Sequence, residues 1–226
     1  MLGRFHVYEG HSPHQVTFPV RLFARLGCRN IILTNAAGSL NPRIPAGTIV
    51  AIHDHISLPS MTGLNPLYGP TSTSTHSPRF LPLSNAYSRT LRKYLFHASM
   101  QLNLPPETLV EGTYCWVTGP TYETAAEGRW LREIGGDVVG ASTVPEVMAA
   151  RDEGMDVLVL SLVTNAVVIP IGEKQGVKKE VERELAGMKY GDSDEKVVSH
   201  DEVLAMGIYK AEVVKQLVMS VVQMIV

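Results

Sequence analysis

The sequence predicts a single α/β domain built on a mixed, mostly parallel β-sheet flanked by helices. Two observations indicate this class: short apolar runs typical of buried strands alternate with helical patterns, and neither a clean linker nor a fixed-period repeat divides the chain. The 226 residues, of which 45% are hydrophobic, are enough to bury a sizeable core. We therefore treat residues 1–226 as one domain.

The predicted strands are short runs rich in Val, Ile and Leu that are apolar on both faces, as central strands of a covered sheet are. In chain order they are residues 30–34, 47–52, 114–118, 137–140 and 157–163.

The first predicted helix begins at the capping box of Ser12 and Gln15, with Pro13 in its first turn, and ends at Gly27. We expect Pro19 to kink or shorten it. A second helical spacing starts at Ser84 and continues to Leu102.

A third helix is expected to be capped by Thr121 and to stop at residues 135–136. A fourth runs from the capping box of Thr143 and Glu146 to Gly154. The last opens at residues 199–202, and its apolar stripe is predicted to dock on the core through Val214, Leu217, Val218, Val221, Val222 and Ile225.

Two long stretches, residues 59–84 and 172–198, carry no clear element. The second is dense in charge. Long irregular stretches in a compact domain are usually functional lids or disordered segments, so we interpret residues 172–198 as a charged lid or insertion.

Composition excludes several classes of protein. With 20 basic and 22 acidic residues the net charge is −2, and no basic block suggests nucleic acid. The N-terminus has no apolar core of a signal peptide, and the longest apolar run, residues 157–171, is too short to span a bilayer. Cys28 and Cys115 are the two cysteines, so a disulfide framework is not expected and a reducing, cytoplasmic location is favoured; both are predicted to be buried apolar residues.

Polar residues that follow the predicted strands are the first functional candidates, because α/β sheets bind ligands at the carboxyl ends of their strands. Asn after a strand also forms turns, so each single case is weak. The candidates are Asn35, His53, His55, Ser142, Thr143, Thr164 and Asn165.

Three segments leave alternatives open. Ser142 and Thr143 precede a helix whose N-terminus can bind an anion, although a plain cap explains them too. Arg4, His6 and Tyr8 share one face of a predicted extended segment, which suits an oxyanion or polar substrate, or is a solvated strand. His53 and His55 could be a metal pair, but no partner spacing supports a metal, so a polar strand end is favoured and no metal is predicted.

Eight motifs occur in one order along the chain and together resemble the trimeric purine nucleoside phosphorylases. They are GRFHVYEG (3–10), VTFPVRLFARLG (16–27), TNAAGSLNP (34–42), DHISLP (54–59), EGTYCWVTGPTYET (111–124), VGASTVPEVMAAR (139–151), SLVTNAV (161–167) and SHDEVLAMG (199–207).

The resemblance implies reversible phosphorolysis of guanosine, inosine and their 2′-deoxy forms to a free purine and (deoxy)ribose 1-phosphate, in purine salvage. It implies no cofactor, with inorganic phosphate as co-substrate, and a homotrimer. It also implies roles for particular residues: Arg4, His6, Ala36 and Ser142 for phosphate; Tyr8, Ala141 and His200 for the ribose; Tyr122, Glu123 and Asn165 for the base; and Phe80 for the neighbouring subunit's site.

The chemistry of these residue types agrees with the implied roles. His6, Glu123 and Asn165 are the implied catalytic residues. Asn165 can donate to the departing purine and serve N7 and O6 together, since an amide offers a donor and an acceptor. Glu123 accepts from the N1–H that 6-oxopurines carry, so guanosine and inosine are predicted over adenosine.

The sequence also departs from the family's pattern. Ala141 and Ala166 stand where Met and Lys are common, and the family's Gly-rich phosphate loop, which precedes the matched region, is not found, so we expect an N-terminally truncated domain. The alternatives to an active phosphorylase are a catalytically impaired homologue or binding subunit, and a methylthioadenosine phosphorylase. The segment Asn35 to Gly38, the pair Tyr122 and Glu123, and Asn165 favour the purine nucleoside branch.

Overall fold

The computed structural model describes residues 1, 3–69, 79–169, 177–186 and 200–225. Five strands form its sheet, in the chain order β1 (Asn30–Ser39), β2 (Ile49–Ser57), β3 (Leu109–Trp116), β4 (Val138–Gly140) and β5 (Asp156–Ala166). All five lie where the apolar runs predict them, and β5 is buried along most of its length, as a central strand should be.

The strands close into a small barrel in the order β1-β4-β3-β2-β5. The pairs β1–β5, β2–β3 and β3–β4 are parallel, whereas β1–β4 and β2–β5 are antiparallel. The prediction of a mixed, mostly parallel sheet is therefore confirmed. Its closure follows from strand pairings between distant segments, which local patterns do not encode.

Nine helical segments accompany the barrel in the described residues. They are η1 (Val7–Glu9), α1 (Pro13–Arg25), α2 (Leu58–Met61), α3 (Arg89–Gln101), η2 (Pro106–Thr108), α4 (Ala125–Glu133), α5 (Val144–Asp152), α6 (Val177–Leu185) and α7 (His200–Ile225).

Three helix predictions need correction. α1 continues through Pro19 to Arg25, so the expected shortening does not occur. α3 starts after Ser88 rather than Ser84, because the Ser88 hydroxyl accepts from the Leu91 N–H. α4 starts after Thr124 rather than Thr121, since Thr124 and Glu127 form a reciprocal capping box.

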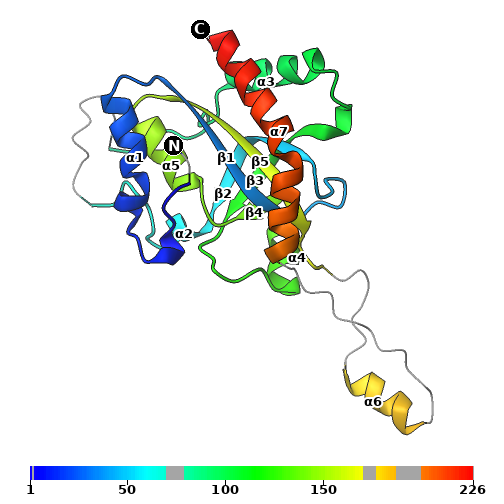
Figure 1. Ribbon diagram of the computed structural model, residues 1–226. Helices are drawn as coiled ribbons and strands as arrows, with labels where there is room; N and C mark the ends of the chain where they lie inside the picture. The colour runs from blue at the N-terminus through cyan, green and yellow to red at the C-terminus, as the bar shows by residue number, and fades with distance from the viewer. Residues whose placement is uncertain (2, 70–78, 170–176, 187–199, 226) are drawn as a thin grey trace.

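Helices cover the barrel on different sides (Figure 1). α1 and α5 pack together over one apolar cluster, which contains Val20, Val147 and Trp116. α3 and α7 pack over a second cluster, which contains Leu95 and Leu217. A third, smaller cluster joins α4 to the barrel through Leu131, Val139 and Val167.

The stripe on α7 docks largely as predicted. Leu217 and Val221 are fully buried, and Val214, Val218 and Ile225 pack against the same cluster. Val222 is the exception: it is 44% exposed, because it falls on the outer side of the helix.

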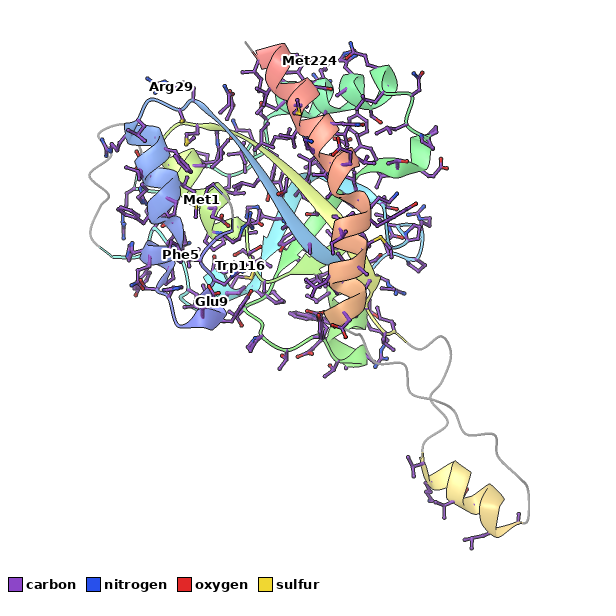
Figure 2. The ribbon with its side chains drawn as sticks, viewed as in Figure 1. Met1, Phe5, Glu9, Arg29, Trp116 and Met224 are labelled. Carbon is purple, nitrogen blue, oxygen red and sulfur yellow. The ribbon has the colours of Figure 1, made fainter. Side chains whose placement is uncertain are left out.

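In Figure 2 the N-terminal segment that carries Phe5 and Glu9 lies beside α1, and Met224 lies at the far end of α7. Cys115 is buried as predicted, but Cys28 is exposed, because it lies past the end of α1 in the turn that leads to β1. Across the described part of the chain, no helix is long and apolar enough to cross a membrane.

Of the predicted charged lid, residues 172–176 and 187–198 lie outside the described residues. The rest holds α6, an amphipathic helix that the sequence reading missed. Figure 1 shows α6 apart from the barrel.

Candidate functional site

Arg4 lies at the centre of a polar cluster between the N-terminal segment, β1 and the start of α5. Its Nη1 donates to Ser142 Oγ at 2.9 Å and to Thr143 Oγ1 at 2.7 Å. Its Nη2 donates to the Thr34 carbonyl at 2.8 Å. Asn35 Nδ2 also donates to Thr143 Oγ1, at 2.9 Å. A guanidinium and two hydroxyls thus meet at one point, which is the donor set that an oxyanion requires.

The Glu146 carboxylate contacts two members of this cluster. Its carboxylate lies 3.5 Å from Arg4 Nη1 and accepts from the Thr143 N–H at 2.9 Å. Burial raises the pKa of Glu146, while Arg4 opposes that rise. An ion pair between the partly buried Arg4 and the buried Glu146 therefore contributes to holding the cluster together.

Thr143 has an unusual backbone, with φ 77°. A β-branched residue pays a steric cost there, and such strain collects at functional sites. Thr143 is the N-cap residue of α5 and its N–H donates to Glu146, in agreement with the predicted capping box, whereas its hydroxyl makes no cap hydrogen bond and accepts from Arg4 instead. An anion would therefore meet the hydroxyls of Ser142 and Thr143 rather than that amide.

His6 and Tyr8 follow Arg4 along the chain, but they do not lie on an extended strand. Residues Val7–Glu9 form the short helix η1, so the predicted strand face is wrong there. The His6 and Tyr8 rings nevertheless stack, with centroids 4.5 Å apart. The η1 turn places them side by side because Glu9 accepts from the His6 N–H at 2.8 Å.

Tyr8 also lines a pocket of about 330 Å³, which we call the main pocket because most of the candidate side chains for the nucleoside meet there. Seven of the candidate residues line it together: Tyr8, Ala36, Tyr122, Glu123, Ala141, Thr164 and Asn165. They come from η1, β1, β5 and the segments that follow β3 and β4. Ala141 is directly bonded to Ser142, so the pocket adjoins the Arg4 cluster.

Asn165 has an ordered amide at the end of β5. The Thr164 hydroxyl donates to Asn165 Oδ1 at 3.0 Å, and Asn165 Nδ2 lies 3.4 Å from the Ala166 carbonyl. Gly38 leaves room beside it, since a Cβ there would come within 3.4 Å of Asn165 Nδ2. The amide is oriented by its neighbours and still faces the pocket.

Glu123 supplies the carboxylate of the pocket. Burial raises its pKa, and the charge of Glu127 adds to that rise. Glu127 itself is engaged in the α4 cap, where the Thr124 N–H lowers its pKa. A half-buried carboxylate with no salt-bridge partner among the described residues is free to bind a ligand's N–H groups.

Asn35, His53, His55 and Phe80 do not line this pocket, although Asn35 contacts Thr143 in the Arg4 cluster. Asn35, His53 and His55 lie within strands rather than after them, and His55 Nδ1 is 2.8 Å from the Tyr87 hydroxyl. Burial lowers the pKa of His55. Phe80 is 90% exposed. Among the described residues, no three His, Cys, Asp or Glu side chains are grouped to hold a metal.

His200 is the first residue of α7, but its side chain lies outside what the structure describes. Val203, one turn further along, lines the main pocket. This places the start of α7 at the site.

Sequence reasoning missed Val117, Val203 and Glu146. The two valines carry no chemical signal in sequence, because apolar walls look like core. Glu146 was assigned only to a cap, and its pairing with Arg4 joins residues 142 positions apart.

The phosphorylase superfamily model matches residues 3–214, and this chain belongs to that family. Within it, the relatives are purine nucleoside phosphorylases. The rat enzyme is 44% identical over 218 residues, which are 96% of this chain and 68% of the rat protein. The mouse enzyme is 49% identical over 169 residues, 75% of this chain and 58% of the mouse protein.

A solved structure agrees with the fold. The Schistosoma mansoni purine nucleoside phosphorylase, determined in complex with inosine, superposes with a TM-score of 0.84 at 37% identity. The match covers 97% of this chain and 70% of that one. The chain thus spans 58% to 70% of the length of these three relatives.

Proposed function

We propose that this chain is a purine nucleoside phosphorylase that acts on guanosine, inosine and their 2′-deoxy forms. The observation that carries the proposal is one pocket lined by Glu123 and Asn165 that adjoins the Arg4, Ser142 and Thr143 cluster. A carboxylate and an amide suit a 6-oxopurine, and the guanidinium and hydroxyls of the Arg4 cluster suit phosphate. Solved Schistosoma relatives hold inosine, guanosine and also adenosine, which supports purine nucleosides as a class; the preference for 6-oxopurines rests on Glu123 and Asn165.

In the proposed reaction, a phosphate oxygen attacks C1′ of the ribose and the bond from C1′ to purine N9 breaks. Arg4, His6 and the Ser142 hydroxyl hold the phosphate, together with the backbone of Ala36. Positive charge develops on the ribose, and the anionic phosphate balances it. Tyr8, Ala141 and His200 form the sugar side of the pocket.

The electrons of the broken bond move onto the purine, and the proton of the hydrogen phosphate ends on the purine when the free base is released. Asn165 donates to N7, and that hydrogen bond strengthens as negative charge develops. Glu123 accepts from N1–H and, in guanine, from the 2-amino group. Tyr122 lies 47% exposed at the mouth of the pocket, where it can stack on the base.

Phosphorolysis of inosine by the purified chain, with release of hypoxanthine and ribose 1-phosphate, tests the proposal. Calorimetry with guanine and with phosphate tests the two subsites separately. Guanine binding with no phosphate binding and no turnover would instead establish the impaired homologue or binding subunit. A preference for methylthioadenosine over inosine would establish the related phosphorylase.

The Asn165→Asp variant tests the proposed role of Asn165 directly. An ionised Asp cannot donate to N7 and repels a purine O6, so 6-oxopurine turnover is expected to fall at least about tenfold. Turnover of adenosine is expected to fall less or to rise, because its 6-amino group donates. An unchanged inosine-to-adenosine ratio in kcat/KM would refute this role. Asn103→Asp, outside the pocket, is the matched control.

We also propose a homotrimer in the cytoplasm, with phosphate as co-substrate and no cofactor. The nearly fully exposed Phe80 ring supports a contact with a neighbouring subunit's site. Two free cysteines, one exposed and one buried, suit a reducing compartment.

A further inference from the structure

A further pocket lies on the surface of α3, and we call it the α3 pocket. It has a volume of about 370 Å³, which is within the size range of small-molecule sites. None of its lining residues lines the main pocket. Six of the lining residues belong to α3, at intervals of three or four positions between residues 89 and 100, so they share one face of the helix.

The N-terminal half of this face is cationic. Arg89, Arg92 and Lys93 line the pocket there, and Glu111 of β3 is the single carboxylate among the described lining residues. Glu111 is paired with Arg92, which holds that guanidinium at the wall. Within the described part of the chain, neither Arg89 nor Lys93 forms an ion pair. Two positive charges are therefore left unbalanced, on a chain whose net charge is −2.

The place of these cations on the helix is unfavourable without a ligand. α3 begins directly after Ser88, and its first turn holds no acidic residue. The N-terminal end of a helix carries partial positive charge, so anions are stabilising there and cations are not. Arg89 is the first helical residue, and Arg92 and Lys93 lie about one turn further on. A bound anion offsets the helix dipole and the side-chain charges together.

The other half of the α3 pocket is apolar. Phe96 packs against the cluster beneath α3 and α7 and also lines the pocket, so its ring forms a fixed wall. Met100, one turn further along, is 72% exposed and lines the same pocket. Aromatic rings pack favourably against both a phenyl ring and a thioether. The pocket thus joins a cationic end to a surface on which a flat ring can pack.

We propose that the α3 pocket binds a small phosphate ester that carries an aromatic ring, and that nucleoside monophosphates belong to this class of ligand. The phosphate contacts Arg89 and Lys93, and the ring packs on Phe96 and Met100. Lys93 and Phe96 are three residues apart, or about 4.5 Å along the helix axis, so one small molecule reaches both. A cavity of roughly 150 Å³ holds one benzene ring, so the larger α3 pocket has room for a ring and a phosphate.

Acylation of Lys93 by acetic anhydride tests this site, because mass spectrometry follows each lysine separately. Lys93 is exposed and should react in the free chain. We expect phenyl phosphate and GMP each to slow its acylation at least about threefold once the pocket is mostly occupied. Phenol should give no protection, and inorganic phosphate should require a higher concentration. Lys215, exposed on α7, is the internal control and should react at an unchanged rate.

Arg89→Ala should weaken the protection of Lys93 by phenyl phosphate about threefold to tenfold, because it removes one charged donor. Arg43→Ala removes the same charge from an exposed turn elsewhere and should leave the protection intact. Arg89 is exposed at the start of α3, so Arg89→Ala should not lower thermal stability. Phe96→Leu should bring the affinity for phenyl phosphate close to that for inorganic phosphate.

The outcomes are distinct from those that test the proposed function. Equal protection of Lys93 and Lys215, or protection that persists in Arg89→Ala, would indicate general ionic screening and overturn the site. Inorganic phosphate as effective as phenyl phosphate would overturn the role of the ring, and protection by phenyl phosphate without protection by GMP would exclude nucleotides. Arg89→Ala should leave kcat/KM for inosine unchanged, since Arg89 does not line the main pocket.

Discussion

Arg4 shows how one side chain can be positioned for a ligand by protein contacts alone. Its guanidinium has hydroxyl, carbonyl and carboxylate partners from β1 and the start of α5. Hydrogen bonds to a charged group contribute about 1.5–3 kcal/mol each, so the side chain is held in one orientation. Because Glu146 already balances its charge, phosphate must share Arg4 with that carboxylate.

Arg4→Lys should therefore act on phosphate specifically. Lysine is a point charge without the planar fork that spans Ser142 and Thr143. We expect KM for phosphate to rise about tenfold or more, with guanine affinity unchanged. Arg43→Lys, on an exposed turn, is the control for the same exchange. An equal loss of guanine affinity would show that Arg4 holds the whole pocket together instead.

Because of Glu123, the affinity for guanine should fall at acid pH. Only the ionised carboxylate accepts from N1–H, and burial raises its pKa above the ordinary value of about 4.3. Affinity for guanine is thus full above the raised pKa and is lost as the pH falls through it. Calorimetry across that range should place the midpoint above 4.3 in solution.

Glu123→Gln should weaken guanine and flatten the pH profile. Glu133→Gln, at the exposed end of α4, should leave the profile intact. A midpoint that persists in Glu123→Gln would assign the titration to another group.

At the scale of elements, β4 depends on a close approach between strands. Gly140 pairs with Trp116 of β3, and a Cβ at Gly140 would come within 2.3 Å of the Tyr114 hydroxyl and 3.3 Å of the Ala36 carbonyl. That hydroxyl is fully buried and interacts with Ser142. Glycine at this position lets β4 deliver Ala141 and Ser142 to the site.

Gly140→Ala should lower the free energy of unfolding by about 1–3 kcal/mol through overpacking. Adding Tyr114→Phe removes the colliding oxygen and should recover part of that loss, while the Ala36 carbonyl remains close. Denaturation of the two single variants and the double variant measures the coupling. Gly207→Ala on α7, with open space around it, is the control and should not destabilise.

The strands could be predicted from sequence because each is a local run of apolar residues, and the confirmed start of α5 rests on a local capping box. Errors arose where two local signals competed. Thr121 and Thr124 both suit a cap, and Glu127 decides for Thr124. The η1 turn was missed because two residues at positions i and i+2 can share one face of an extended strand or stack across a tight turn. The sequence pattern is the same in both cases.

At the scale of the whole molecule, closure of the barrel brings distant segments to one pocket. Tyr8 and Asn165 line the same pocket although 157 positions separate them. Their roles were expected from the family resemblance, whereas their contacts depend on strand pairings such as β1 with β5. The pocket beside Trp130 and the Arg4–Glu146 ion pair also result from this packing of distant segments. No local sequence pattern predicts them.

The proposed trimer makes a prediction about how sites are shared. Phe80 is 90% exposed and lines neither the main pocket nor the pocket beside Trp130 in its own chain. Removing its ring should therefore not disturb the fold. If it completes a neighbouring site, Phe80→Ala should lower kcat/KM for inosine at least about threefold, with little change in thermal stability. Tyr68→Ala, another highly exposed aromatic, is the control.

Complementation tests the sharing directly. In co-expressed Phe80→Ala and Glu123→Gln chains, some sites combine an intact Phe80 from one subunit with an intact Glu123 from the next. Random assembly of a ring makes about a quarter of the sites whole, so activity should exceed the average of the two parent variants. If Phe80 served the site of its own chain, no site would be whole in any mixture. Activity at the parental average would therefore exclude the shared site.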